Sequence, residues 1–144
     1  MTASDFFVWA AECARERPVH EARLDSLRDR RGRGIATATT TAGGDPTAGR
    51  AMAAMAKEPA VLEALRLCEW VLDRAEGVTR AVSEGLGPMY ALALTLHYLD
   101  GNTWGMVAQE LHVSTSTIFR MRQTALDWID CEGLTASVGR RRKD

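Results

Sequence analysis

The stretch TWGMVAQELHVSTSTIFRMRQTALDWID, residues 103–130, decides the fold. Two hydroxyl residues, Thr103 and Ser114, stand eleven positions apart, and each precedes a run of helix-forming residues. A hydroxyl at such a position caps a helix by accepting hydrogen bonds from its free backbone amides. The first capped helix is short and is followed by a turn at His112 and Val113. Two capped helices with this spacing predict a helix-turn-helix unit.

The apolar residues of this stretch agree with two helices that cross closely. Val107 and Leu111 lie four positions apart on the first helix, and Ile118 and Met121 recur at helical spacing on the second. Residues three or four apart lie on one side of an α-helix, so these four side chains are expected to point inward. Ala108 is small enough to let the helices approach. The sequence therefore predicts a buried seam between them.

The outward side of the second helix is polar and basic. Hydroxyl groups gather at its N-terminus, where the positive end of the helix dipole favours contacts with phosphate or base edges. Arg120 has the geometry to read guanine and Gln123 to read adenine, whereas Arg122 lies further round the helix and suits phosphate. No acid follows on this helix until Asp127. The candidate DNA-binding residues are Thr103, Ser114, Thr115, Ser116, Thr117, Phe119, Arg120, Arg122, Gln123 and, in the tail, Arg140, Arg141, Arg142 and Lys143.

A further helix over residues 88–101 is expected to complete the module. Pro88 opens it, and Asp100 and Gly101 are turn residues that close it. Five apolar residues recur at helical spacing and are expected to form its buried face. These residues are Met89, Leu92, Ala93, Leu96 and Leu99.

A longer packing helix is predicted upstream, over residues 51–85. Pro59 suits its first turn, and Gly85 and Gly87 end it. Its seam residues alternate in steps of four and three, the heptad spacing of a helix that packs along its length against another helix. Two interpretations stay open, namely packing on the N-terminal helices of the same chain and a homodimer seam through residues 61–82. The seam residues are Val61, Leu65, Cys68, Leu72, Ala75, Thr79 and Val82.

The chain before that helix divides into two segments. Residues 1–31 have a helical pattern, with a break or kink expected at Pro18. Residues 32–50 are rich in Gly, Thr and Ala and contain one large apolar residue, so a flexible linker is expected there. With a helix-turn-helix module over residues 86–132 and a basic tail over residues 133–144, the sequence predicts an all-α protein.

The charge is distributed unevenly along the chain. The formal net charge is only −1 and the sequence pI is about 6.3, whereas a nucleic-acid-binding domain is often strongly basic. Residues 51–100 hold four Lys or Arg against seven Asp or Glu, and residues 140–143 are four consecutive cations. Because the distribution of charge matters more than its sum, the neutral total does not exclude DNA binding.

Enzyme and metal-binding classes find no support in the sequence. Cys13, Cys68 and Cys131 lie far apart without a CxxC pair, and the three histidines are scattered. Reduced, buried thiols and no metal site are therefore expected. There is no catalytic triad or paired carboxylate at motif spacing and no phosphate-binding glycine loop. The sequence predicts a cytoplasmic protein that is not an enzyme and has no cofactor, metal or membrane-spanning segment.

Five short motifs lie within the segment Leu96–Asp130, namely Tyr98–Gly101, Thr103-Trp104, Val107-Ala108, Ser114 and Ala125-Leu126. On these motifs the segment resembles the C-terminal module of the phage-encoded transcriptional regulators of the ArpU and RinA kind. That module is itself similar to region 4 of sigma factors. The resemblance covers about a third of the chain and implies regulation of phage or prophage genes through promoter DNA, with host RNA polymerase as a further partner.

The predicted function is thus a transcriptional regulator that reads the major groove of double-stranded DNA with the helix at residues 115–130. Two alternatives stay open. A phage small terminase subunit also joins a helix-turn-helix to oligomerising helices, but it assembles as a ring. A protein-binding adaptor would use the same bundle to contact RNA polymerase, with little DNA affinity of its own.

Overall fold

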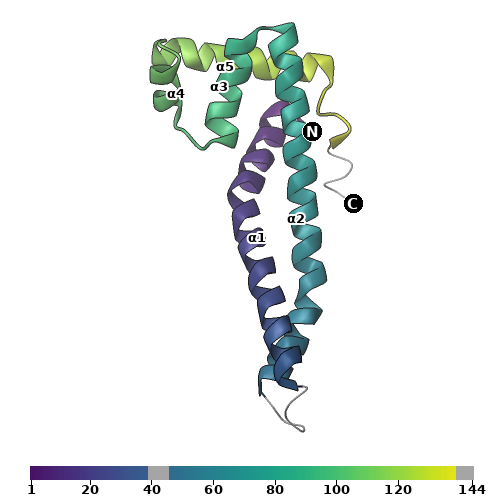
Figure 1. The fold of residues 1–144 in the computed structure, drawn as a ribbon. Helices are drawn as coiled ribbons and strands as arrows, with labels where there is room; N and C mark the ends of the chain where they lie inside the picture. The colour runs from purple at the N-terminus through teal and green to yellow at the C-terminus, as the bar shows by residue number, and fades with distance from the viewer. Residues whose placement is uncertain (39–45, 139–144) are drawn as a thin grey trace. The chain divides into compact units, whose positions relative to one another are not determined.

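The computed structural model describes residues 1–38 and 46–138, and every regular element in them is helical (Figure 1). This confirms the predicted all-α fold. None of the described helices is long and apolar enough to cross a lipid bilayer. In chain order the elements are α1 (Ala3–Ala38), α2 (Pro46–Gly85), α3 (Pro88–Leu94), the π-helical turn η1 (Thr95–Leu99), α4 (Trp104–Glu110) and α5 (Thr115–Glu132).

The described chain forms two compact units. Unit 1 contains residues 1–14 and the described residues from Trp70 onwards, and unit 2 contains residues 15–69. Unit 1 therefore holds the start of α1, the end of α2 and all of the shorter helices. This division differs from the consecutive segments expected from the sequence, because residues 1–14 belong with the helix-turn-helix and not to a separate arm.

An aromatic core joins the start of α1 to the rest of unit 1. Phe6 and Phe7 are completely buried, and their rings meet edge to face with centroids 5.3 Å apart. The Phe7 ring also lies 5.2 Å from the ring of Tyr98, which belongs to η1. Large aromatic side chains contribute a large share of the burial energy of a small core. The first turns of α1 are therefore part of the core that supports the helix-turn-helix.

Two hydrogen bonds join the N-terminus of the chain to the end of α5 and to the residues that follow it. The backbone amide of Ala3 donates to Asp130 Oδ1 over 2.7 Å. The hydroxyl of Thr135, which is almost fully buried, donates to the carbonyl of Met1 over 2.9 Å. Both bonds join residues that are far apart in the sequence, so the first residues of the chain do not form a separate arm.

In unit 2, the segments of α1 and α2 lie side by side (Figure 1). Apolar residues of both helices form one buried cluster. At the same level, Glu58 accepts hydrogen bonds from Arg28 Nε at 3.2 Å and Arg31 Nη1 at 2.8 Å. The cluster consists of Leu24, Leu27, Ala54, Val61 and Leu65.

The heptad seam of the second long helix is covered within a single chain. Six of its seven residues are buried, and only Leu72 is partly exposed. Val61 and Leu65 belong to the cluster shared with α1. Packing inside the chain therefore accounts for the heptad spacing, as the first of the two interpretations expected, and the seam does not require a second copy.

The two long helices extend further than the local sequence signals indicated. α1 continues past Pro18 to Ala38, and α2 begins at Pro46, so Pro59 lies inside the helix and not in its first turn. The linker expected over residues 32–50 is therefore helical at both ends, and residues 39–45 lie outside the described residues. Both internal prolines are exposed, so water can reach the carbonyls left without a helical partner.

The inner face of α3 is only partly the one predicted. Ala93 is buried and Leu96 packs against the core as expected, but Met89 and Leu92 are each 43% exposed. The predicted face assumed one regular helix from residue 88 to residue 101, but α3 changes to a π-helical turn at Thr95, where the amide of Asp100 donates to the Thr95 carbonyl over 3.0 Å. A wider turn shifts the phase of the side chains, so a 3.6-residue pattern cannot be carried through it. The buried residues are Ala91, Ala93, Leu94 and Tyr98.

The cysteine prediction is right at two positions and wrong at the third. None of the three described cysteines forms a disulfide; Cys13 and Cys68 are buried, but Cys131 is exposed. Cys131 lies near the end of α5, where Ile129 is buried but Asp130 and Glu132 are exposed.

We predict that Gly85→Ala destabilises unit 1, because a Cβ at this position would overlap the indole ring of Trp128. Forcing an extra carbon into a packed contact costs about 1–3 kcal/mol of the free energy of unfolding. Urea denaturation followed by circular dichroism measures the change.

Gly77→Ala is the matched control on the same helix, since apart from its chain neighbours and the surrounding helix backbone no described atom lies within 4 Å of its added Cβ. Replacing this glycine in a helix should stabilise the protein by about 0.5–1 kcal/mol. Equal effects of the two substitutions would contradict a tight contact between Gly85 and Trp128.

Candidate nucleic-acid interface

Both predicted helix caps are present. Thr103 precedes α4, and its hydroxyl accepts a hydrogen bond from the Met106 amide at 3.2 Å. Ser114 precedes α5, and its hydroxyl accepts from the Thr117 amide at 3.1 Å while donating to Thr117 Oγ1 over 2.8 Å. Each cap satisfies an amide that has no partner within its own helix. The two helices therefore begin where the sequence predicts.

The turn between α4 and α5 depends on one left-handed residue. His112 has a φ of 57°, and it is the only described residue other than glycine with a positive φ. The Val113 amide donates to the Ala108 carbonyl over 3.0 Å, and the His112 amide donates to the Gln109 carbonyl over 3.2 Å. Histidine accepts this conformation at a modest cost, and these hydrogen bonds offset it.

The predicted seam between the two helices is confirmed. Its members form one cluster that includes residues from α3, α4 and α5, and Leu96, Trp104, Val113 and Met121 pack against it. Val107 and Ile118 are completely buried and Ala108 is nearly so, as a close crossing requires. The buried members are Ala93, Val107, Ala108, Leu111 and Ile118.

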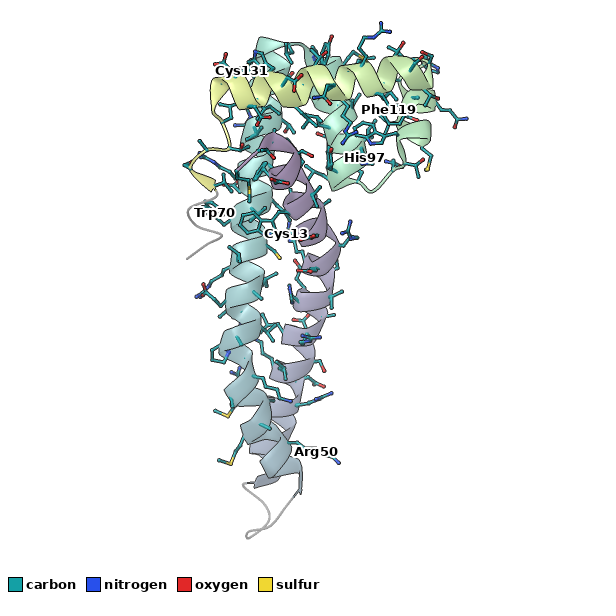
Figure 2. The ribbon with its side chains drawn as sticks, turned by 180° about the vertical axis from the view of Figure 1, so that it is seen from behind. Cys13, Arg50, Trp70, His97, Phe119 and Cys131 are labelled. Carbon is teal, nitrogen blue, oxygen red and sulfur yellow. The ribbon has the colours of Figure 1, made fainter. Side chains whose placement is uncertain are left out.

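An aromatic stack lies beneath the candidate interface and was not predicted. The rings of His97 and Trp104 stack with centroids 3.9 Å apart, and Phe119 of α5 lies 6.3 Å from Trp104. Figure 2 shows His97 and Phe119 near one another toward one end of α5. Of these three residues, only Trp104 belongs to a motif on which the family resemblance rests. The spacing of the residues in the sequence carries no signal that their rings meet.

His97 also holds the loop that leads into α4. Its Nδ1–H donates to the Asn102 carbonyl over 2.7 Å, and the Asn102 side chain donates to the Leu96 carbonyl over 2.9 Å. Burial lowers the pKa of His97 below its ordinary value of 6.5, and the nearby charge of Arg122 lowers it further, while the hydrogen bond to the Asn102 carbonyl acts in the opposite direction. The neutral imidazole is thus favoured in the folded protein.

The exposed side of α5 presents a small set of free groups. Phe119 is 45% exposed, and Arg120 and Thr115 are exposed with no hydrogen bond or ion pair within the described residues. Gln123 is exposed but already engaged, since its Nε2 donates to Asp127 Oδ1 over 2.8 Å. Of the two predicted base-reading residues, Arg120 is therefore the more available.

Arg122 lies in a different environment from the one expected for a phosphate contact. Its Cζ lies 5.7 Å from the centre of the Trp104 ring, within the range of a cation–π interaction. The side chain is partly buried, and its Nε has no hydrogen-bond partner within the described residues. Arg122 thus contributes to the packing over Trp104, with only the outer part of the guanidinium left for a ligand.

The remaining candidate residues divide into two groups. Ser116 lies beside Ser114, with their hydroxyl oxygens 3.3 Å apart, so three of the four hydroxyls at the start of α5 contact one another and Thr115 stays free. Arg140, Arg141, Arg142 and Lys143 lie outside the described residues.

Comparisons with protein-family models, with curated proteins and with solved structures each gave no match. Function is therefore inferred from the residues of this chain.

We predict that Ser114→Ala lowers the free energy of unfolding by about 1 kcal/mol, the usual cost of removing a helix cap. Thermal unfolding followed by circular dichroism measures the loss. Thr124→Ala, at an exposed position of the same helix, is the control and should be neutral or slightly stabilising. A loss of the same size in both variants would show that the Ser114 cap has no particular importance.

The lowered pKa of His97 predicts a pH dependence of stability. The unfolded chain takes up a proton at a higher pH than the folded chain does, so stability is complete above the unfolded pKa of about 6.5 and falls as the pH drops below it. His97→Gln should flatten this fall. Denaturation midpoints between about pH 7.5 and about pH 5 measure it.

Thr124→Ala again serves as the control, because it retains His97 and should retain the full pH dependence. The explanation fails if wild type and His97→Gln lose stability in parallel over this range.

Proposed function

We propose that this chain is a non-enzymatic transcriptional regulator that binds double-stranded DNA sequence-specifically, with the N-terminal half of α5 in the major groove. One observation carries the proposal. The exposed side of that half-helix combines hydroxyl groups, Phe119 and an unpaired Arg120, with no acid before Asp127. A helix of this character, held by a capped partner helix, is what insertion into a major groove requires.

The proposed contacts follow from the chemistry of each side chain. The free Thr115 hydroxyl and the first amides of α5 suit a phosphate, since the helix dipole is positive at that end. Arg120 reads guanine through two parallel hydrogen bonds, and Phe119 offers an apolar surface for a thymine methyl group. Gln123 reads adenine only after it releases Asp127, so its contribution is smaller.

The genes under control are, on this proposal, phage or prophage genes. The support is the resemblance of Leu96–Asp130 to the C-terminal module of the ArpU and RinA kind of regulator, which implies control of phage genes through promoter DNA. The caps at Thr103 and Ser114 and the buried pair Val107 and Ala108 are among the residues on which that resemblance rests.

An adaptor that contacts RNA polymerase is the second candidate, and the charge of the module favours it. Residues 103–126 contain two arginines and one acid, and Arg122 is partly buried, so the described module offers few phosphate contacts. A weakly charged module binds DNA weakly on its own because phosphate neutralisation supplies much of the affinity. Met89 and Leu92, each 43% exposed on α3, would suit a protein partner.

We predict that Arg120→Ala reduces affinity for the preferred DNA site by about tenfold to about a hundredfold, the value of one bidentate contact to guanine, and leaves affinity for random duplex nearly unchanged. The preferred site is first selected from a random duplex library with the wild-type protein. Fluorescence anisotropy then measures both affinities at fixed salt.

Two comparisons sharpen the result. Arg80→Ala, at an exposed position of α2, is the charge-matched control and should change neither affinity much. Removing residues 140–143 should weaken binding to all DNA alike and flatten the salt dependence by about 0.9 for each phosphate that the tail no longer neutralises.

The proposal has three ways to fail. Equal losses on preferred and random duplex for Arg120→Ala would exclude base reading by this residue. Absence of binding to any duplex at low salt would instead favour the polymerase adaptor. A ring of about eight or more subunits in light scattering would favour the terminase alternative.

A further inference from the structure

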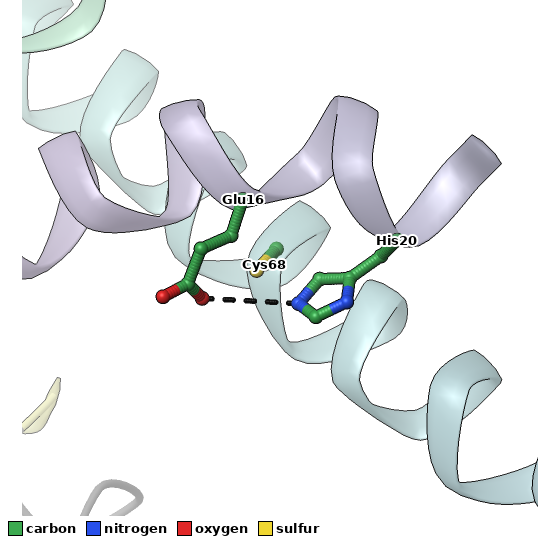
Figure 3. A group of neighbouring side chains, drawn as sticks. All are labelled: Glu16, His20 and Cys68. Carbon is green, nitrogen blue, oxygen red and sulfur yellow. Dashed lines mark ion pairs between the residues drawn. The ribbon is translucent and has the colours of Figure 1, made fainter. Parts of the chain in front are cut away.

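Unit 2 brings together three side chains, a carboxylate, an imidazole and a thiol, each of which can offer a ligand atom to a metal ion. Glu16 and His20 lie four residues apart on α1, and Cys68 comes from the neighbouring face of α2. Their ligand-type atoms, one from each residue, all lie within 4.8 Å of one another. Figure 3 shows the carboxylate, the thiol and the imidazole gathered at one point between the two helices.

The imidazole of His20 lacks a strong hydrogen bond within the described residues. Its Nε2 lies 3.7 Å from Glu16 Oε2, which is too long for a good hydrogen bond. Its Nδ1 is buried without any hydrogen-bond partner in the part of the chain that the structure describes. The lone pair of Nε2, which faces Glu16, is therefore available to a further partner.

We propose that Glu16, His20 and Cys68 bind a divalent transition-metal ion of the zinc class. Thiolate, imidazole and carboxylate are the three ligand types that Zn²⁺ uses in proteins, whereas the sulfur ligand disfavours Mg²⁺ and Ca²⁺. Metal–ligand distances of about 2.0–2.3 Å place tetrahedral ligand atoms roughly 3.3–3.8 Å apart, so small rotations of the side chains suffice.

The three residues differ in their exposure to solvent, and this determines which side of the site is open to water. Cys68 is 4% exposed and the His20 side chain 18%, whereas the Glu16 side chain is 60% exposed. The ion is thus held between the helices, and a fourth coordination position faces solvent and takes water. Binding displaces the Cys68 thiol proton to solvent, so affinity rises with pH. The buried Nδ1–H of His20 has no acceptor to orient it, which keeps the affinity moderate.

The consequence for the molecule is a link between α1 and α2 inside unit 2. Two ligands come from α1 and the third from α2, so the ion links the two helices. The apolar cluster of unit 2 lies on the same two helices. An ion that binds only the folded state stabilises it by mass action. The site is distinct from the candidate DNA interface, which belongs to unit 1.

Titration of the full-length, EDTA-treated protein with Co²⁺ tests the proposal. Cobalt substitutes for zinc, and its absorption spectrum reports both tetrahedral geometry and thiolate ligation. We expect intense visible bands and a sulfur-to-cobalt charge-transfer band in wild type, both lost on adding Zn²⁺. Cys68→Ser should abolish the charge-transfer band, and Glu16→Gln and His20→Gln should weaken binding at least about tenfold.

Cys131→Ser is the matched control, because this cysteine is exposed and lies in unit 1. It should leave the spectrum and the affinity unchanged. The absence of a charge-transfer band in wild type overturns the proposal, and so does a band that persists in Cys68→Ser or disappears in Cys131→Ser. Should substitution of the buried cysteine prevent folding, the exposed Glu16→Gln decides, and undiminished cobalt affinity in that variant also overturns the proposal.

Discussion

The left-handed backbone at His112 is the constraint on which the helix-turn-helix depends. With a φ of 57° at this one residue, the chain leaves α4, forms the hydrogen bond from Val113 to Ala108, and reaches the cap of α5 at Ser114 through one short turn. The buried Val107 and Ile118 then meet across the small Ala108. The direction of α5, and with it the side that carries Arg120, follows from this turn and from the packing behind it.

The packing behind the turn comes from remote parts of the chain. Trp104, the first residue of α4, stacks on His97 of the π-helical turn, and that turn in turn places Tyr98 against Phe7 near the N-terminus. π-helical turns are rare and frequently occur at functional sites. This one places His97 against Trp104 and Tyr98 against Phe7. The first turns of α1 therefore stabilise the helix-turn-helix directly, although about ninety residues separate Phe7 from Tyr98.

The sequence alone predicts the features that depend on local chemistry. The caps at Thr103 and Ser114 and the seam at Val107 and Ile118 follow from spacing within a few turns, and all are confirmed. The contact of Phe7 with Tyr98 and the bond from Ala3 to Asp130 depend on tertiary packing, for which helical periodicity carries no information. The predictions made at Pro18 and Pro59 were wrong for a related reason. Packing along the two long helices outweighed the local cost of a proline inside a helix, and the exposure of both prolines to water reduces that cost.

In the candidate interface, too, some features follow from local sequence spacing and others depend on tertiary packing. The exposure of Phe119 and Arg120 follows from the helical period, whereas the positions of Arg122 over Trp104 and of Gln123 against Asp127 depend on neighbours that the period does not specify. These two contacts reduce the number of free polar groups and leave Arg120 as the principal cation of α5. For the proposed function, few phosphate contacts mean low affinity for random duplex, because that affinity is almost entirely electrostatic. Discrimination between sites is a ratio of affinities, so a weakly charged module whose main free cation reads a base can remain selective at modest affinity.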